Sequence, residues 1–541
     1  MKKQAQFFVI VLLVLGLFFR FVNIDKKFYW YDEVFTSLRI SGYTQTEIFR
    51  SLGNGKVVSP QDLMKYQRPS REKNFGDTVK SLAIEEPQLP PLYFVAVKYW
   101  VQIFGDSVAV TRSFSALMSL LVFPCLYWLC RELFAAPEVA WIAVGLVAVS
   151  PLHVLYAQEA RPYSLWPAMI LLCGASLLRA LRLQTKISWG IYTIATILGI
   201  YTHLFGVLVA IGHGIYVLLI EGFKLNKKVI GYASAMAGSV LAFTPWLLIL
   251  VLNKKAATGA TNWSDMQTSR LSLVKNWAGN IGRLFFDLGL TSESPSIYLI
   301  PFAVANLILL GIAGYAVYFL CTQTRKQVWL FVLAMMAVTA LAVIVPDVIL
   351  GGIRSTKARY LFPTYLGIQI AVAYLLATKV SAGLGPNSKP QVWKVVTVIL
   401  LSCGILSGAV SSEAEIWWTK EWGRENPEIA VRINVAEKPL VVSDLSEVSL
   451  GNVLSMSHLL ESKVRLQLFN LNPQAPSENQ SENQSVDLSN IPKIRRDFSD
   501  VFIYGRGQAF GLKLANLQNS KIELVAGSKN SSLWLGKLVQ K

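Results

Sequence analysis

Residues 6–22 read QFFVIVLLVLGLFFRFV and follow the basic residues Lys2 and Lys3. A basic start before an apolar run is typical of a signal sequence. No small-residue cleavage site follows, and the chain continues as NIDKKFYW at 23–30. We therefore interpret the run as an uncleaved signal anchor, which leaves the N-terminus in the cytoplasm.

Composition extends this interpretation to most of the chain. Of 541 residues, 53% are hydrophobic and only 16% are charged, and the mean hydropathy is +0.43. Soluble domains carry about a quarter charged residues. Long apolar runs recur along the chain and predict an all-α polytopic membrane protein with about eleven transmembrane helices. The predicted spans are 6–22, 114–131, 138–152, 163–180, 189–203, 205–221, 229–251, 296–320, 328–346, 361–378 and 395–411.

The net charge of +18 does not indicate a nucleic-acid partner, because the basic residues form short clusters between the apolar runs. Such clusters mark cytoplasmic loops. They are Arg131, then Arg179, Arg182 and Lys186, then Lys224, Lys227 and Lys228, then Arg325 and Lys326, then Lys379, Lys389 and Lys394. The five cysteines all lie in or at the ends of apolar segments, with neither a disulfide framework nor metal-ligand spacing.

The segment 91–104, PLYFVAVKYWVQIF, is apolar but too short for a span and contains Lys98. If it crossed, every basic loop listed above would lie outside. We therefore expect an amphipathic helix on the outer interface, with Tyr93, Tyr99 and Trp100 at headgroup level.

The same alternation places the loops 23–113, 252–295 and 347–360 outside, in a membrane domain of residues 1–412. The tail, 413–541, is also expected outside, in a multi-pass plasma-membrane protein. Apolar strands at 440–442, 501–505 and 532–539 and a helix near 451–461 predict a small extracytoplasmic α/β domain. The repeat SENQSENQS at 477–485 predicts a disordered loop.

The span centres are nearly free of charge, whereas a transport pathway would place ionisable residues there. Unusual polar residues gather beyond the outer helix ends instead, which indicates chemistry at the outer interface. The first candidate is Asp32-Glu33 in FYWYDEVFTSLRISGY at 28–43. A carboxylate beneath aromatic side chains suits a general base. Alternatively, the two acids cap a surface helix that begins at Val34.

Two basic motifs suit an anionic ligand. Arg161, in QEARPY at 158–163, can bind a phosphate through two parallel hydrogen bonds, although a local pairing with Glu159 is the alternative. GGIRSTKARY at 351–360 places three basic residues outside, against the usual bias. Phosphate binding explains this excess, with Tyr360 as a further donor, and a solvated charged loop is the alternative.

Taken in order, the acidic pair, the loop ending in PPLYF, the motif YAQEARPYSL and the motif KARYLFPTYL resemble the GT-C membrane glycosyltransferases. The likeness is to the protein O-mannosyltransferase and aminoarabinose-transferase superfamily, in particular its bacterial dolichyl-phosphate-mannose–protein mannosyltransferase-like branch. It covers about residues 1–380. Relatives commonly have His-Pro-Pro-Leu where this chain has Leu89-Pro90-Pro91-Leu92, so any role of that histidine is absent here.

The resemblance implies transfer of a sugar from a polyprenyl-phosphate donor to a hydroxyl of a glycan, lipid or protein in the cell envelope. It implies Asp32 as the catalytic base, with Glu33 beside it. The candidate substrate-binding residues are Glu86, Glu159, Arg161, Tyr163, Arg354, Lys357, Arg359 and Tyr360. A single displacement would invert the anomeric centre.

No cofactor is required, because the donor arrives activated, and no metal ligands are assigned, although a divalent metal stays open. The alternatives to this enzyme are a transporter of lipid-linked glycans, a polymerase or ligase of such glycans, and a non-catalytic relative.

Overall fold

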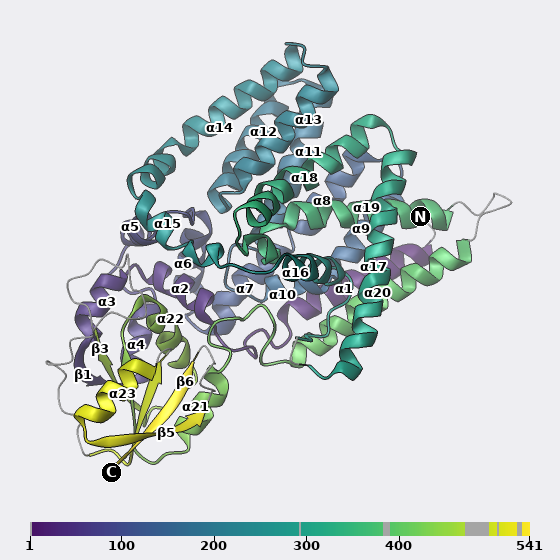
Figure 1. Ribbon diagram of the computed structural model, residues 1–541. Coiled ribbons are helices and arrows are strands. Elements are labelled where there is room, and N and C mark those ends of the chain that lie inside the picture. Colours follow the sequence, from purple (N-terminus) through teal and green to yellow (C-terminus); the bar gives the residue numbers. More distant parts are fainter. Residues whose placement is uncertain are drawn as a thin grey trace. The chain divides into compact units, whose positions relative to one another are not determined.

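The computed structural model describes residues 3–291, 294–381, 390–470, 497–505, 508–526 and 533–540 (Figure 1). The chain forms two compact units. Unit 1 comprises Met1–Lys26, Glu86–Tyr93 and Ala109–Ala414, and unit 2 comprises Lys27–Glu85, Phe94–Val108 and Glu415–Lys541. Unit 1 ends close to the predicted domain boundary. Unit 2 combines the tail with most of the first long loop, a grouping that the sequence does not reveal.

Unit 1 is helical throughout its described part. Its longer helices are α1 (Lys3–Phe21), α7 (Val108–Ser119), α8 (Val122–Leu133), α9 (Pro137–Ala148), α10 (Pro151–Ala157), α11 (Leu165–Leu183), α12 (Lys186–Thr202), α13 (Gly206–Glu221), α14 (Lys227–Leu252), α16 (Arg270–Gly282), α17 (Ser296–Gln323), α18 (Lys326–Ile349), α19 (Phe362–Ser381) and α20 (Pro390–Glu413). Short turns separate some of them: α15 (Lys254–Gly259), η2 (Asn262–Asp265), η3 (Arg354–Thr356) and η4 (Ala358–Tyr360).

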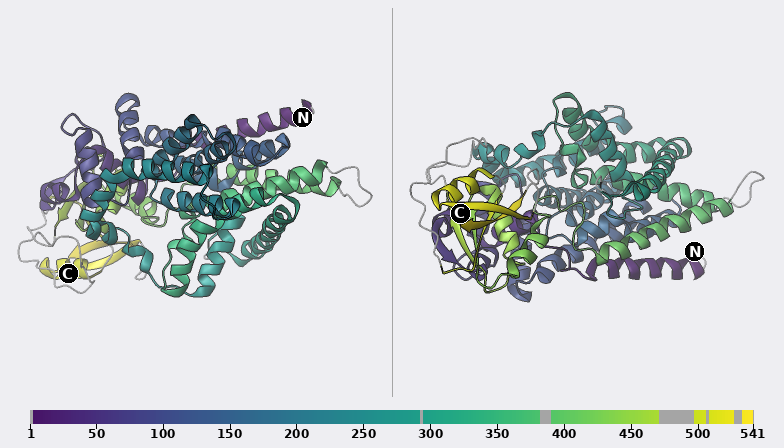
Figure 2. Two further views of the ribbon diagram at one scale, coloured as in Figure 1. Left: turned by 90° about the horizontal axis from the view of Figure 1, so that it is seen from above. Right: turned by 60° about the horizontal axis from the view of Figure 1, so that its bottom comes forward.

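Each predicted span coincides with one of these helices or with a consecutive pair. Among the described residues, seven helices are long and apolar enough to cross a membrane, counting α7 and α8 as one, and the bent pair α9–α10 makes an eighth. Residues 7–21 of α1 and the helix α13 are apolar but shorter. The chain is therefore a multi-pass membrane protein. α19 packs against α9, α17, α18 and α20, and α1 lies beside α9 and α20. The right-hand view of Figure 2 shows the purple α1, at the N-terminus, alongside green helices of unit 1.

The predicted span 138–152 is wrong in extent, because the helix breaks and continues to residue 157. α9 and α10 are bent by 58° at the break. Pro151 is the first residue of α10, and a proline there has no N–H for the preceding turn and disfavours a helical residue before it.

A buried arginine stabilises this break. The Arg20 guanidinium of α1 donates to the carbonyl oxygens of Ala148 at 2.7 Å and Val147 at 3.3 Å, which end α9. It also donates to the Gly16 carbonyl at 2.7 Å and to Ser119 Oγ at 3.0 Å. Carbonyls at a helix end have no partner within the helix, so a buried end needs such donors.

Unit 2 is an α/β unit. Its helices are α2 (Tyr31–Ser41), α3 (Gln45–Leu52), α4 (Pro60–Met64), η1 (Lys65–Gln67), α5 (Phe75–Glu85), α6 (Leu92–Phe104), α21 (Asn426–Asn434), α22 (Glu447–Met456) and α23 (Gln508–Leu517). Its strands are β1 (Asn54–Val58), β2 (Pro439–Asp444), β3 (Arg465–Phe469), β4 (Asp500–Gly505), β5 (Ser520–Ala526) and β6 (Trp534–Gln540). They form one sheet in the order β1-β3-β2-β4-β6-β5.

The centre of this sheet is parallel, with β2 between β3 and β4, and the outer pairings are antiparallel. The predicted strands correspond to β2, β4 and β6, and the predicted helix is α22, which begins and ends earlier than expected. Strands β1, β3 and β5 were not predicted. The SENQSENQS repeat lies outside the described residues.

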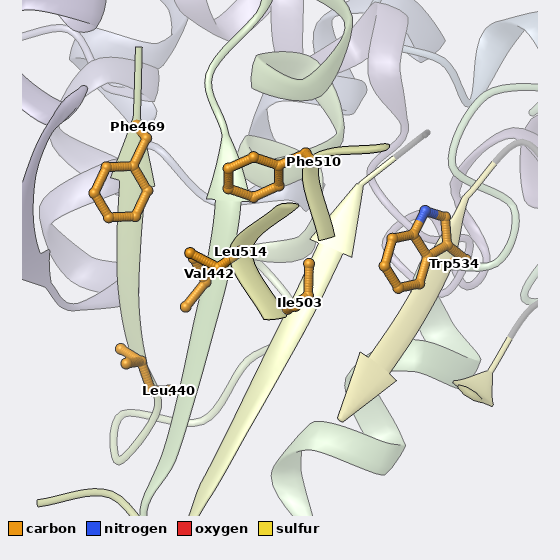
Figure 3. Packing of buried hydrophobic residues seen from close by; sticks show 7 residues of the cluster. All are labelled: Leu440, Val442, Phe469, Ile503, Phe510, Leu514 and Trp534. Carbon is orange, nitrogen blue, oxygen red and sulfur yellow. The ribbon is translucent and has the colours of Figure 1, made fainter. Parts of the chain in front are cut away.

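The core of unit 2 lies between the sheet and α23. Leu440 and Val442 are two residues apart and therefore share one face of β2. Phe510 and Leu514 are four residues apart and share one face of α23. With Phe469, Ile503 and Trp534 they form one buried cluster (Figure 3).

Candidate functional site

The candidate residues of unit 1 begin with the turn between α10 and α11, which carries the motif QEARPY. Gln158 Nε2 donates to the carbonyl oxygens of Phe19 and Val22, each at 2.9 Å, and so joins the turn to the end of α1. Every residue from 158 to 164 is buried. The turn therefore holds Arg161 and Tyr163 in fixed positions.

An acidic residue that was not predicted from the sequence holds the second basic motif, 351–360, in its fold. Asp347, near the end of α18, accepts a 2.6 Å hydrogen bond from the Ser355 N–H. Gly351 and Gly352 have φ of +85° and +138°, which side chains rarely adopt. A Cβ on Gly352 would also lie 2.7 Å from Asp347 Oδ1. The two glycines thus turn the chain back onto the carboxylate.

The loop 252–295 supports this motif from another direction. The Ile353 N–H donates to the Ser264 carbonyl at 2.8 Å. From α16, Trp277 Nε1 donates to Ser355 Oγ at 3.0 Å, and Asn280 Nδ2 donates to the Thr356 carbonyl at 2.8 Å. Three elements therefore fix η3 and η4. Arg359 and Tyr360 lie in η4, and Lys357 lies between the two turns.

These supports bring the two basic motifs together around three aromatic rings. The Arg359 guanidinium carbon lies 5.2 Å from the ring centroid of Tyr163, 5.6 Å from that of Trp263 and 5.4 Å from that of Tyr360. The Arg161 guanidinium carbon lies 5.6 Å from the Tyr163 centroid.

Lys357 Nζ lies 5.7 Å from the Trp263 centroid, and the Trp263 and Tyr360 rings are stacked at 6.4 Å. We call the six residues the cation–aromatic cluster: Arg161, Tyr163, Trp263, Lys357, Arg359 and Tyr360.

The cluster is suited to an anion. Stacking uses the face of a guanidinium, whereas a phosphate is bound by its edge, so one arginine can do both. Trp263, in η2, was not predicted. The sequence gives one hint of its role, because Trp263 is an aromatic residue within one of the few polar loops of the chain.

The remaining candidates of unit 1 are placed differently. Arg354 donates to Ser264 Oγ at 2.6 Å, so it supports the loop and is not a member of the cluster. Glu159 is buried in the same turn as Arg161, and its carbonyl accepts from the Arg161 N–H at 2.7 Å. Glu86 is half-buried, and its carbonyl accepts from the Leu89 N–H at 2.9 Å.

The candidate acidic residues of unit 2 lie in the first turn of α2. The helix begins at Tyr31 and not at Val34, and no side chain caps it. Asp32 is half-buried and Glu33 is fully buried. The alternative was right that both acids lie in the first turn of a helix, but that helix begins at Tyr31 and is buried along most of its length.

Glu33 forms an ion pair with a residue from the other end of the chain. Lys420 Nζ lies 2.9 Å from Glu33 Oε2, and both side chains are 0% exposed. Lys420 was not predicted. Its segment, WWTKEW at 417–422, does carry a local sign, since three tryptophans beside a lysine are unusual in a polar tail.

In the described part of the chain, no three His, Cys, Asp or Glu side chains lie close enough together to hold a metal ion. The histidines of the spans pack and form hydrogen bonds. His153 Nε2 lies 3.0 Å from Gln369 Oε1, His213 Nδ1 lies 3.1 Å from the Tyr192 hydroxyl, and His203 Nδ1 accepts from the Phe205 N–H at 3.2 Å.

Comparison with known proteins gives this architecture a class. Residues 88–249 match the family model described as dolichyl-phosphate-mannose-protein mannosyltransferase. That segment includes the motif of Arg161 and Tyr163. A comparison with curated protein sequences gives no match. The match to the family model agrees with the likeness to which the sequence motifs pointed.

Two solved structures of similar fold are those of ArnT from Cupriavidus metallidurans. One was determined bound to undecaprenyl phosphate; it has a TM-score of 0.52 and 14% sequence identity, and the match covers 98% of each chain. The other is in the apo state, with a TM-score of 0.53 and 13% identity, and the match covers 99% of this chain and 98% of that one. This likeness confirms the predicted mostly helical membrane fold with a small sheet-containing C-terminal part.

Proposed function

We propose that the chain is a glycosyltransferase that moves a sugar from a polyprenyl-phosphate donor to an acceptor hydroxyl on the outer face of the plasma membrane. The observation that carries this proposal is the cation–aromatic cluster, which gathers two arginines and one lysine from two separate motifs around three rings. A sugar phosphodiester carries one negative charge, and the leaving polyprenyl phosphate gains a second. Cations near the phosphate therefore stabilise the transition state more than the ground state.

In this proposal Asp32 is the general base and Arg359 and Arg161 bind the donor phosphate. Asp32 removes the proton of the acceptor hydroxyl while its oxygen forms a bond to the anomeric carbon. The bond from that carbon to the phosphate oxygen breaks, and the phosphate leaves with the electron pair. One in-line displacement inverts the anomeric centre. Lys357, Tyr163 and Tyr360 complete the phosphate site, and no cofactor is needed.

The compared proteins support the class of donor. ArnT, with a similar fold, was solved with undecaprenyl phosphate bound, and the matched family is described by a dolichyl-phosphate sugar. A lipid donor of this kind also suits a multi-pass membrane protein, because the prenyl chain stays in the bilayer.

The proposed sidedness rests on contacts within unit 2. β1, from the first loop, pairs with β3 of the tail, with Asn54 opposite Phe469. A hydrogen-bonded sheet cannot have its strands on opposite sides of a bilayer. An even number of crossings must therefore separate residue 58 from residue 465, which holds for the ten predicted spans between them only if α6 does not cross.

Two contacts, one just after α6 and one in its middle, support the same conclusion. Asp106, just after the helix, forms a 3.1 Å salt bridge with Arg68, which precedes it. Lys98 in its middle is buried and donates to the Ile40 carbonyl at 2.9 Å. We therefore propose that the first loop and the tail are both extracytoplasmic and that α6 lies on the outer interface.

A transfer assay tests the proposal. Membranes from a strain that lacks this chain are incubated with purified chain and a panel of radiolabelled polyprenyl-phosphate sugars. We expect label from at least one donor to move to an acceptor fraction only when the chain is added, with release of polyprenyl phosphate. The proposal would be contradicted if the chain transferred no sugar and also bound no polyprenyl phosphate saturably.

A further inference from the structure

The ion pair between Lys420 and Glu33 is more deeply buried than two other acid–lysine ion pairs of unit 2. Both of its side chains are 0% exposed. By contrast, Lys463 and Glu461 of unit 2 are 40% and 57% exposed at 3.3 Å, and Lys65 and Glu72 are 50% and 63% exposed. Lys420 and Glu33 are thus a completely buried pair of opposite charges, and Glu33 directly follows the proposed catalytic base in the chain.

Stability of the fold alone does not account for a buried ion pair. Burying two charges costs more than their attraction returns unless the geometry is very good, and apolar residues of similar size often stabilise a fold as well. A buried ion pair does fix the relative position of its two side chains, because each buried charge must lie against its partner. We therefore look for the role of this ion pair in the position that it gives to Glu33.

Further contacts join the residues around Glu33 to those around Lys420. The Phe28 N–H donates to the Glu415 carbonyl at 3.1 Å. Lys420 Nζ lies 5.9 Å from the Phe28 ring centroid and 5.6 Å from that of Trp30. Aromatic faces attract a cation, so the two rings help to hold the ammonium group of Lys420 beside Glu33.

The residues preceding Asp32 are fixed by the tail as well. Ser455 Oγ donates to the Tyr29 carbonyl at 2.6 Å, and the rings of Tyr31 and Trp422 lie 5.7 Å apart. A Cβ on Gly451 would lie 2.4 Å from the Tyr31 ring, so α22 approaches this segment as closely as a glycine allows. No side chain caps the start of α2, and the tail supplies the restraints in its place.

We propose that Lys420 is a positioning residue of the transfer reaction, which acts through Glu33 to fix the first turn of α2 and thereby the direction of the Asp32 carboxylate. This inference rests on the proposed function. It also gives the tail a role, since segment 415–422 would then be part of the catalytic apparatus.

A double-mutant cycle in kcat tests the inference. Lys420→Met, Glu33→Gln and the double variant are purified in nanodiscs and assayed for sugar transfer. Misplacing a catalytic group by about 1 Å costs on the order of a hundredfold in rate. We expect Lys420→Met to lower kcat by about that factor, with the donor KM changed by less than about threefold. In the Glu33→Gln background the same substitution should lower kcat by less than about fivefold, because the interaction through which it acts is already absent.

Two further variants separate positioning from folding. Lys420→Arg keeps the charge and should restore most of the activity, while Lys463→Met removes a lysine from an exposed pair of the same unit and should leave kcat unchanged. Unfolding temperatures are measured in parallel. If Lys420→Met does not accumulate as folded protein, the double variant and Lys420→Arg carry the test, because both avoid an unpaired buried carboxylate.

The outcomes are distinct. A Lys420→Met enzyme with wild-type kcat, or one whose loss is equally large in the Glu33→Gln background, overturns the positioning role while leaving the proposed function intact. A fall in kcat that coincides with a matching loss of folded protein, with no rescue by arginine, also overturns it. A wild-type chain that transfers no sugar overturns the proposed function and this inference together.

Discussion

The guanidinium carbons of Arg161 and Arg359 lie 5.6 Å and 5.2 Å from the centroid of one ring, that of Tyr163. The two residues come from separate loops, and their like charges repel each other. An anion bound between such cations relieves that repulsion and accepts hydrogen bonds from both. This arrangement is the physical basis for assigning the donor phosphate to the cluster.

Arg359→Ala should weaken donor binding strongly. A hydrogen bond to a charged group contributes about 1.5–3 kcal/mol, so we expect the Kd for undecaprenyl phosphate to rise by about ten- to a hundredfold. Binding can be measured by native mass spectrometry of the protein in nanodiscs. Arg270→Ala is the matched control, because Arg270 is an exposed arginine at the start of α16. Equal affinities of wild type and Arg359→Ala would remove this arginine from the phosphate site.

The placement of α6 can be tested by labelling single cysteines in a chain whose native cysteines are replaced. Phe75→Cys and Ser107→Cys lie before and after α6 at exposed positions, and both should react with a membrane-impermeant reagent in intact cells. Leu225→Cys, in the predicted cytoplasmic loop between α13 and α14, is 83% exposed and should react only after permeabilisation. Labelling of Phe75→Cys without Ser107→Cys would mean that α6 crosses the membrane.

Arg20→Met should destabilise unit 1. The substitution leaves three carbonyl oxygens and one hydroxyl without the donors that now satisfy them. Each unsatisfied buried polar group costs about 1–3 kcal/mol. We expect a lower unfolding temperature in detergent and faster proteolysis near the break between α9 and α10. Unfolding that matches the wild type would show that another group satisfies these carbonyls.

Asp444 gives the stability of unit 2 a defined pH dependence. Burial raises the pKa of Asp444 above its ordinary value near 4, and hydrogen bonds from Ser449 and Ser446 offset part of this rise. The folded state therefore holds its proton to a higher pH than the unfolded state, so the free energy of unfolding falls as the pH rises above about 4. Asp444→Asn removes the titrating group and should gain stability relative to wild type as the pH rises above about 4.

Asp62 provides the opposite control for this titration. Hydrogen bonds from the Ser59 N–H and hydroxyl lower the pKa of Asp62, so its contribution to stability is present at neutral pH and lost as the pH falls. Asp62→Asn should therefore cost stability at pH 7 and little at acid pH. Unfolding temperatures of both variants, measured by scanning fluorescence across this range, give the two signs. A pH-independent difference for Asp444→Asn would contradict the assigned titration.

The membrane helices were predictable because a span needs a long apolar run, and such a run is visible locally. The bend at Pro151 was locally visible too, but the prediction ended the span at residue 152, one residue past the proline. The strands β1 and β3 could not be found in this way. Each is short, and their pairing joins Asn54 to Phe469 across most of the chain, so neither strand is evident without the other.

The candidate site shows the same division. Arg161 and Arg359 are found by motif, since basic residues outside a membrane protein need a reason. Trp263 and Lys420 contribute through contacts with residues distant in sequence, and the local signs that they carry do not identify those partners. Arg354 belongs to the same motif as Arg359, yet its guanidinium bonds to Ser264 and supports the loop. Residue type and motif thus indicate a phosphate site, and only the folded loop separates the arginine of the cation–aromatic cluster from the arginine that supports the loop.

The turnover of Asp32→Asn tests the central claim most directly, because it separates donor binding from chemistry. Asparagine keeps the size of the side chain but cannot accept the proton, and loss of a general base costs about a hundredfold to ten-thousandfold in rate. The variant, shown to be folded and inserted, should bind undecaprenyl phosphate as tightly as wild type and transfer sugar at a rate reduced by that factor. Near wild-type transfer with purified donor and acceptor would contradict the account, and the base would then have to be sought at Glu33, Glu86 or Glu159.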